Sequence, residues 1–112
     1  HNTMVGNRWS DILAKGIKAY EDLGYPDEWK KHHQGGPTGY QSREFTVNPK
    51  TQGVVSKWQP VAWNPSITGT KSEDTILTGE ESPEVITPTF NWPVVDVELD
   101  GMIYKRPDIL EK

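Results

Sequence analysis

The chain has 112 residues, of which 33% are hydrophobic, and a formal net charge of -4 at pH 7. This length suits one modest domain, and the low hydrophobic fraction predicts a small core. The acidic balance argues against nucleic acid or an anionic membrane as a partner, since both favour surfaces rich in Lys and Arg. Cysteine is absent, which excludes disulfides and thiolate metal sites and fits a reducing compartment.

No membrane or targeting signal stands out in the sequence. There is no apolar run long enough for a transmembrane helix and no charged-then-apolar leader. We therefore expect a cytoplasmic protein in which residues 1–112 form a single unit.

Apolar residues near the amino terminus recur at the three-to-four spacing of one helical face. They are Trp9, Ile12, Leu13, Ile17, Tyr20 and Leu23. This spacing predicts one long helix over residues 9–23, with Asn7 or Ser10 as its cap. Gly24 and Pro26 follow closely and predict its end, because glycine adopts the left-handed conformation readily and proline cannot continue a helix.

After the helix, short apolar runs alternate with turn residues, a pattern typical of strands. The candidate strands are Glu44 to Val47, Gly53 to Val55, Pro60 to Trp63, Asp74 to Thr78, Val85 to Thr87, Val94 to Leu99 and Met102 to Tyr104. Asp100 and Gly101 predict a two-residue hairpin turn between the last two runs. The fold class is therefore α+β, with one long helix packed on a mostly antiparallel sheet and a loose tail over residues 106–112.

The stretch "HHQGGPTGYQSRE", residues 32–44, is too rich in glycine for a helix and too short of alternation for a buried strand. Adjacent histidines seldom bind one metal ion, so His32 and His33 alone are more typical of a surface loop or of partner-contacting side chains. Gly35, Gly36 and Gly39 allow positive φ and close approach of other backbone or ligand. The stretch is either a functional loop or a tight surface turn.

The stretch "VAWNPSITGTKSEDTIL", residues 61–77, places Asn64 at the end of one apolar run and Glu73 at the start of another. Two strand ends joined by a loop can aim two oxygen-bearing side chains into one cavity. The alternative is an Asn-Pro turn followed by a solvated loop end.

Together, in this order, the two stretches resemble the carboxyl-terminal half of the pita-bread metallopeptidases, which include methionine aminopeptidase, Xaa-Pro aminopeptidase, prolidase and creatinase. The Xaa-Pro peptidase branch is particularly similar. The likeness spans most of the chain, as far as "WP" and "RPDIL" near its end. It implies the second half of a pita-bread fold, so that the chain is the carboxyl-terminal portion of a peptidase domain.

The resemblance also implies roles for individual residues. His33 stands where the family has a metal-binding histidine, and Glu73 where a carboxylate bridges two metal ions, so these two are the expected catalytic residues. Asn64 stands where the family has a glutamate that binds metal and acts as general base. His32, Tyr40 and Arg43 are expected to contact a peptide substrate. The implied cofactor is a divalent metal ion, Mn, Co or Zn.

Two departures from the family pattern limit what this chain does alone. The amide of Asn64 offers a carbonyl oxygen to a cation but does not accept a proton at neutral pH. The two aspartates that the family takes from a strand before the helix are absent from the sequence. We therefore expect the fragment to bind no metal and to be inactive without the missing N-terminal half or a second copy of the chain.

Two alternatives remain open. One is a creatinase-like hydrolase that uses His and carboxylates without metal, which the amide at position 64 favours. The other is a non-catalytic module that binds peptides or proteins, which the many aromatic residues favour.

Overall fold

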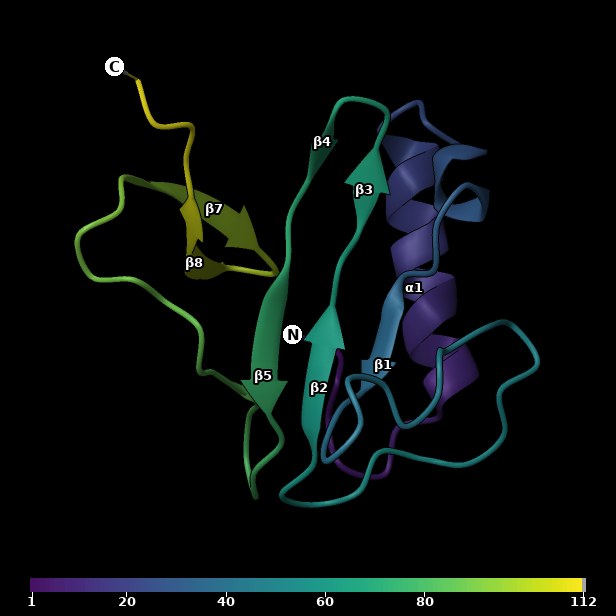
Figure 1. Cartoon of the computed structure of the whole chain (residues 1–112). Helices are drawn as coiled ribbons and strands as arrows, with labels where there is room; N and C mark the ends of the chain where they lie inside the picture. Colours follow the sequence, from purple (N-terminus) through teal and green to yellow (C-terminus); the bar gives the residue numbers. More distant parts are fainter. Residues whose placement is uncertain (112) are drawn as a thin grey trace.

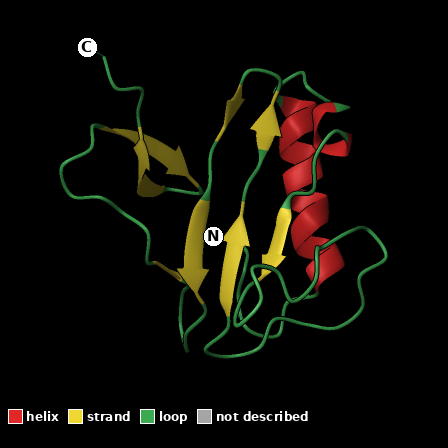
Figure 2. Cartoon of the chain, viewed as in Figure 1, coloured by secondary structure: helices red, strands yellow, loops and turns green. Residues whose placement is uncertain are grey.

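One helix and three separate antiparallel sheets make up the computed structural model, which describes residues 1–111 (Figures 1 and 2). The elements in chain order are α1 (Trp9–Asp22), the 3₁₀ turn η1 (Glu28–Lys30), β1 (Gly35–Pro37), β2 (Pro60–Trp63), β3 (Ser66–Ile67), β4 (Thr70–Lys71), β5 (Asp74–Leu77), β6 (Glu84–Val85), β7 (Val94–Leu99) and β8 (Met102–Pro107). The largest sheet has the strand order β1-β2-β5-β6, while β3 pairs with β4 and β7 pairs with β8.

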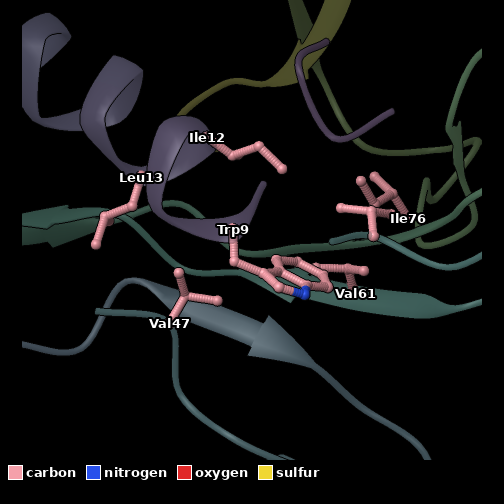
Figure 3. Close-up of a cluster of buried hydrophobic side chains, with 7 residues drawn as sticks. Trp9, Ile12, Leu13, Val47, Val61 and Ile76 are labelled. Carbon is pink, nitrogen blue, oxygen red and sulfur yellow. The ribbon is translucent and has the colours of Figure 1, made fainter. Parts of the chain in front are cut away.

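The buried core lies between α1 and the largest sheet. Its members are Trp9, Ile12, Leu13, Val47, Val55, Val61 and Ile76. Figure 3 shows the indole of Trp9 at the centre of this cluster, and the side chain is only 2% exposed. Its ring meets the ring of Phe45 edge to face, with the centroids 5.6 Å apart. One aromatic side chain from the first helical turn therefore connects the helix, the sheet and the loop before Val47.

The predicted fold, one long helix packed on a mostly antiparallel sheet as the second half of a pita-bread fold, is wrong. Helix α1 is short, with 14 residues, and its fully buried residues all lie in its first half. Ile17 is only partly buried against the core, and Leu23, just after the helix, is 75% exposed. The strands form three small sheets because proline and glycine interrupt the chain repeatedly after Pro60. The unit is still α+β in composition, but no single sheet covers a long helix.

The boundaries of α1 follow partly from the expected signals. Gly24 has a φ of +85°, so the helix ends where glycine predicts. The N-cap residue is Arg8, which makes no side-chain cap hydrogen bond. The prediction of Asn7 or Ser10 as the cap is therefore wrong.

Two predicted strands are absent from the described residues, and three observed strands, β1, β3 and β4, were not predicted. Residues 44–47 form no strand, although the amides of Glu44 and Val47 donate to β1. Residues 53–55 form only an isolated bridge between Val54 and Arg8. The buried strand β1 lies inside the glycine-rich stretch for which we predicted no strand. Its pairing with β2 needs close backbone approach, which local alternation does not reveal.

The carboxyl-terminal hairpin forms as expected, and it is longer than expected. β7 and β8 pair in register around Asp100 and Gly101. Arg106 and Pro107, predicted as part of the loose tail, are the last residues of β8. Among residues 1–111, no helix has the length and apolar character needed to cross a membrane.

Candidate functional site

The candidate residues His33, Asn64 and Glu73 lie near the ends of three neighbouring strands. In the sheet, Gly35 pairs with Trp63, and Trp63 pairs with Asp74. His33 shortly precedes β1, Asn64 directly follows β2 and Glu73 directly precedes β5. The antiparallel register therefore brings all three to one end of the same sheet. A backbone hydrogen bond of 2.9 Å from the amide of Asn64 to the carbonyl of Gln34 fixes the first two segments to each other.

The carboxylate of Glu73 is held by two cations. Its Oε1 accepts from Nη2 of Arg43 at 3.1 Å, and its Oε2 accepts from Nζ of Lys71 at 2.9 Å. The hydrogen bond from Lys71, and then that from Arg43, holds the pKa of Glu73 below its ordinary value. Glu73 is thus ionised at neutral pH, and both of its oxygens already have partners.

His33 is exposed at the edge of this charged cluster. Loss of water contact is the largest cause that lowers its pKa, followed by the charges of His32 and Arg43. The two histidine rings are close, with centroids 4.3 Å apart, and Nδ1 of His32 lies 2.5 Å from the carbonyl oxygen of His33. A lowered pKa means that His33 is mostly neutral at pH 7, so its imidazole can accept a proton or bind a cation.

Asn64 supplies the buried polar group of the site. The residue is only 3% exposed, and its Oδ1 atom has no hydrogen-bond partner among the described residues. The Nε atom of Arg43 is also buried without a partner among these residues. An unpaired buried acceptor costs free energy unless a ligand or a water molecule satisfies it. The two atoms are one acceptor and one donor that no described residue satisfies.

The structure separates the other predicted contact residues. Arg43 joins the cluster through its ion pair with Glu73. Tyr40 is fully exposed in the turn after β1, and its side chain makes no hydrogen bond to the cluster within residues 1–111. Sequence reasoning missed Lys71, which the pairing with Glu73 brings into the site. Its position two residues before Glu73 is the available signal, because alternate residues of an extended chain share a face.

A groove of about 970 Å³ reaches the same cluster. Both Lys71 and Glu73 line it, together with Trp63 from β2. The remaining wall is largely apolar and includes Leu13, Ala19, Leu23, Ile67 and Leu99. This volume lies at the upper end of the range for small-molecule sites, which is roughly 300–1,000 Å³. An apolar groove that ends at a charged cluster can hold an apolar side chain while polar groups contact the adjoining backbone.

The described residues do not fit a resident divalent metal ion by themselves. Within residues 1–111, no three His, Asp or Glu side chains form a group that could hold a metal. The candidate donors are the imidazole of His33, the amide oxygen of Asn64 and the carboxylate of Glu73. Because Glu73 is paired with Arg43 and Lys71, a cation there would have to displace or face two positive charges.

Titration of His33 tests the electrostatic description of this cluster. The substitution His32→Gln removes a neighbouring positive charge, so we expect the pKa of His33 to rise toward its ordinary value of about 6.5. Because the unfolded chain binds this proton more readily, His33 also makes folding less favourable as the pH falls through this range. A heteronuclear NMR titration of the imidazole measures the shift. Lys57→Gln is the control, since Lys57 pairs with Glu80 instead; an unchanged or lower pKa after His32→Gln would contradict the description.

Compared with family models, curated proteins and solved structures, the chain gives no match.

Proposed function

We propose that this chain supplies part of the active site of a peptide hydrolase of the Xaa-Pro peptidase type. The observation that supports the proposal most directly is the convergence of His33, Asn64 and Glu73 at one end of the sheet, beside an apolar groove. His33 comes from a separate part of the sequence, whereas Asn64 and Glu73 are joined by the short hairpin β3–β4. The resemblance to the family is the reason for considering these three positions. The cytoplasm is the proposed location, in keeping with a chain that contains no cysteine.

The residues of this chain have distinct tasks under the proposal. The apolar wall of the groove binds an apolar part of the peptide substrate and excludes water from it. Neutral His33, at the same end of the sheet as Glu73, accepts a proton or offers a lone pair. Arg43 keeps Glu73 ionised and positioned, while His32 and Tyr40 are available to contact the substrate from the surface. The amide of Asn64 cannot take over the role of a general base.

The divalent metal, Mn, Co or Zn, belongs to the proposal only together with further ligands. His33 and Glu73 are too few to hold a catalytic cation, and Glu73 is already neutralised by Arg43 and Lys71. Additional carboxylates from an N-terminal half of the protein or from a second copy of the chain would change this balance. We accordingly expect the isolated chain to have no hydrolytic activity.

A metal-free hydrolase is the second candidate, and the paired state of Glu73 favours it specifically. The carboxylate of Glu73 accepts hydrogen bonds from Lys71 and Arg43, so it positions these two side chains instead of binding a metal ion. A non-catalytic peptide-binding module is the third candidate, favoured by the apolar groove and by exposed aromatic side chains such as Tyr40 and Phe90.

The substitution Glu73→Ala in the intact protein separates these candidates. If the metallopeptidase proposal holds, elemental analysis should detect bound metal that the variant loses, and cleavage of an Xaa-Pro dipeptide should fall roughly 100-fold or more. Loss of activity from a protein that never contained metal would support metal-free chemistry. If the unaltered protein has neither metal nor activity, the result would support the third candidate, a non-catalytic peptide-binding module.

Glu80→Ala is the matched control for this experiment. Glu80 is likewise a surface glutamate in an ion pair with a lysine, Lys57, but its pair lies outside the candidate cluster. We expect the control variant to keep the metal content and activity of the unaltered protein. Equal losses in both variants would indicate a general effect of removing a surface carboxylate and would contradict a special role for Glu73.

A further inference from the structure

The carboxyl-terminal hairpin stands apart from the rest of the fold. β7 and β8 pair only with each other, and no other helix or strand of residues 1–111 lies beside them (Figure 1). An ion pair between Arg106 of β8 and Asp74 ties the hairpin to the largest sheet, while every residue of β7 is exposed. A hairpin of two strands is marginally stable in water and gains stability when a third strand or another surface covers it. The outer edge of the hairpin is therefore a candidate interaction surface, while Leu99 and Pro107 of the same hairpin line the groove beside Glu73.

The register determines which backbone groups of β7 face outward. Leu99 and Met102 flank the two-residue turn, so they form a hydrogen-bonded pair, as do alternate pairs along the hairpin. The amide and carbonyl groups of Val94, Asp96 and Glu98 consequently point away from β8. No backbone hydrogen bond to another described segment uses these groups. The outer edge of β7 thus presents a row of unpaired donors and acceptors.

The two edges of the hairpin differ in their protection against pairing. The outer edge of β8 includes Lys105 and ends with Pro107, which has no amide hydrogen. Lysine and proline are the residues that most often blunt an exposed strand edge. β7 contains neither of them. The edge of β7 is therefore the one suited to accept another strand.

The side chains of β7 define what such a strand must carry. One face has Val95, Val97 and Leu99, which are 44%, 44% and 45% exposed. The opposite face has the carboxylates of Asp96 and Glu98. Asp96 pairs with Lys105 inside the hairpin, whereas Glu98 has no ion pair among the described residues. Complementarity calls for a strand with apolar side chains on one face and basic side chains on the other.

A second copy of β7 does not meet this requirement. In antiparallel pairing with full overlap, Asp96 of one copy lies opposite Val97 of the other, so polar and apolar faces are mixed. A shift by one residue in either direction restores the apolar face but sets Asp96 opposite Asp96 or opposite Glu98. Like charges directly opposite each other destabilise a sheet. Charge therefore favours a partner of different sequence.

We propose that the free edge of β7 binds an extended protein segment in which apolar and basic residues alternate, so that the hairpin becomes a three-stranded antiparallel sheet. Outward amide and carbonyl groups supply the main-chain hydrogen bonds, and Val95, Val97 and Leu99 supply the apolar contact. Asp96 and Glu98 select basic side chains over acidic ones. The proposal does not depend on hydrolysis, because the binding groups lie on the edge of β7, and Leu99 is the one residue among them that also lines the groove beside Glu73.

The test uses the whole chain and a blocked synthetic peptide of alternating valine and lysine. NMR titration should show shifts concentrated in residues 94–99, and the double charge reversal Asp96→Lys with Glu98→Lys should weaken binding about tenfold or more. Peptide with glutamate in place of lysine should bind the unaltered chain more weakly than the lysine peptide. N-methylation of the peptide amides that would donate hydrogen bonds to β7 should also weaken binding. This test leaves the protein itself unchanged.

Several results would overturn the proposal. Equal binding of the lysine and glutamate peptides would show that charge does not select the partner, and unaffected binding after N-methylation would rule out strand addition. Glu84→Lys, on the separate strand β6, is the control variant and should bind the lysine peptide as the unaltered chain does. Analytical ultracentrifugation tests for a dimer. If the unaltered chain dimerises at high concentration and the variant with Asp96→Lys and Glu98→Lys does not, the edge of β7 binds a second copy of the chain instead.

Discussion

Replacing Trp9 by alanine should lower the free energy of unfolding by about 3–5 kcal/mol, the usual cost of truncating a large buried aromatic side chain. Trp9 is 2% exposed and contacts Phe45 and Trp63. The loss would be a large fraction of the total, since small domains are stable by only about 5–15 kcal/mol. Urea denaturation followed by far-ultraviolet circular dichroism measures the change.

Trp58→Ala is the control for this prediction because it removes the same kind of side chain from the surface. Trp58 is 62% exposed, so its removal should alter the free energy of unfolding by no more than about 0.5 kcal/mol. Similar losses for the two variants would contradict a core centred on Trp9. A Trp9→Phe variant should fall between them, because it keeps part of the buried aromatic area.

Features that depend on neighbouring residues were largely predictable from the sequence. The helix over residues 9–22 has the apolar spacing of one face, and Gly24 ends it where expected. The hairpin around Asp100 and Gly101 follows from a turn that these two residues favour strongly. In both elements the determining interactions lie within a few residues along the chain.

Features that depend on distant contacts were not predictable. The alternation of apolar and polar residues could not reveal β1, because the pairing of β1 with β2 relies on glycine and not on apolar side chains. The apolar stripe of α1 predicted burial as far as Leu23, yet full burial stops at Leu13, Ile17 is only partly buried and Leu23 is 75% exposed. Spacing alone cannot state where a covering surface stops.

The candidate site shows the same division. His33, Asn64 and Glu73 were identified from their motifs, and the register then accounts for their meeting at one end of the sheet. The ion pairs that Glu73 makes with Arg43 and Lys71 were not predicted. These ion pairs change the expected chemistry. The carboxylate of Glu73 was expected to bind metal ions, but in the fold two positive side chains already neutralise it.

The second large effect concerns Gly35, at the start of β1. A Cβ atom built on this residue would lie 2.1 Å from the carbonyl oxygen of Ala62 and 2.9 Å from Cα of Trp63, both on the neighbouring strand. Its φ of +129° is also a conformation that residues with side chains rarely adopt. Gly35→Ala should therefore cost about 3 kcal/mol or more, from backbone strain and overpacking together.

Gly53→Ala isolates the backbone part of this cost. Gly53 has a φ of +85°, but a Cβ there would meet no atom within 4 Å, so its replacement should cost only about 1–2 kcal/mol. Thermal unfolding of the two variants measures the difference. Equal losses would mean that β1 and β2 do not approach as closely as the register requires. A larger loss at Gly35 would link stability to the candidate site, because the same approach brings the carbonyl of Gln34 to the amide of Asn64. The glycines beside His33 would then be needed to bring the strand ends together, whichever chemistry the site performs.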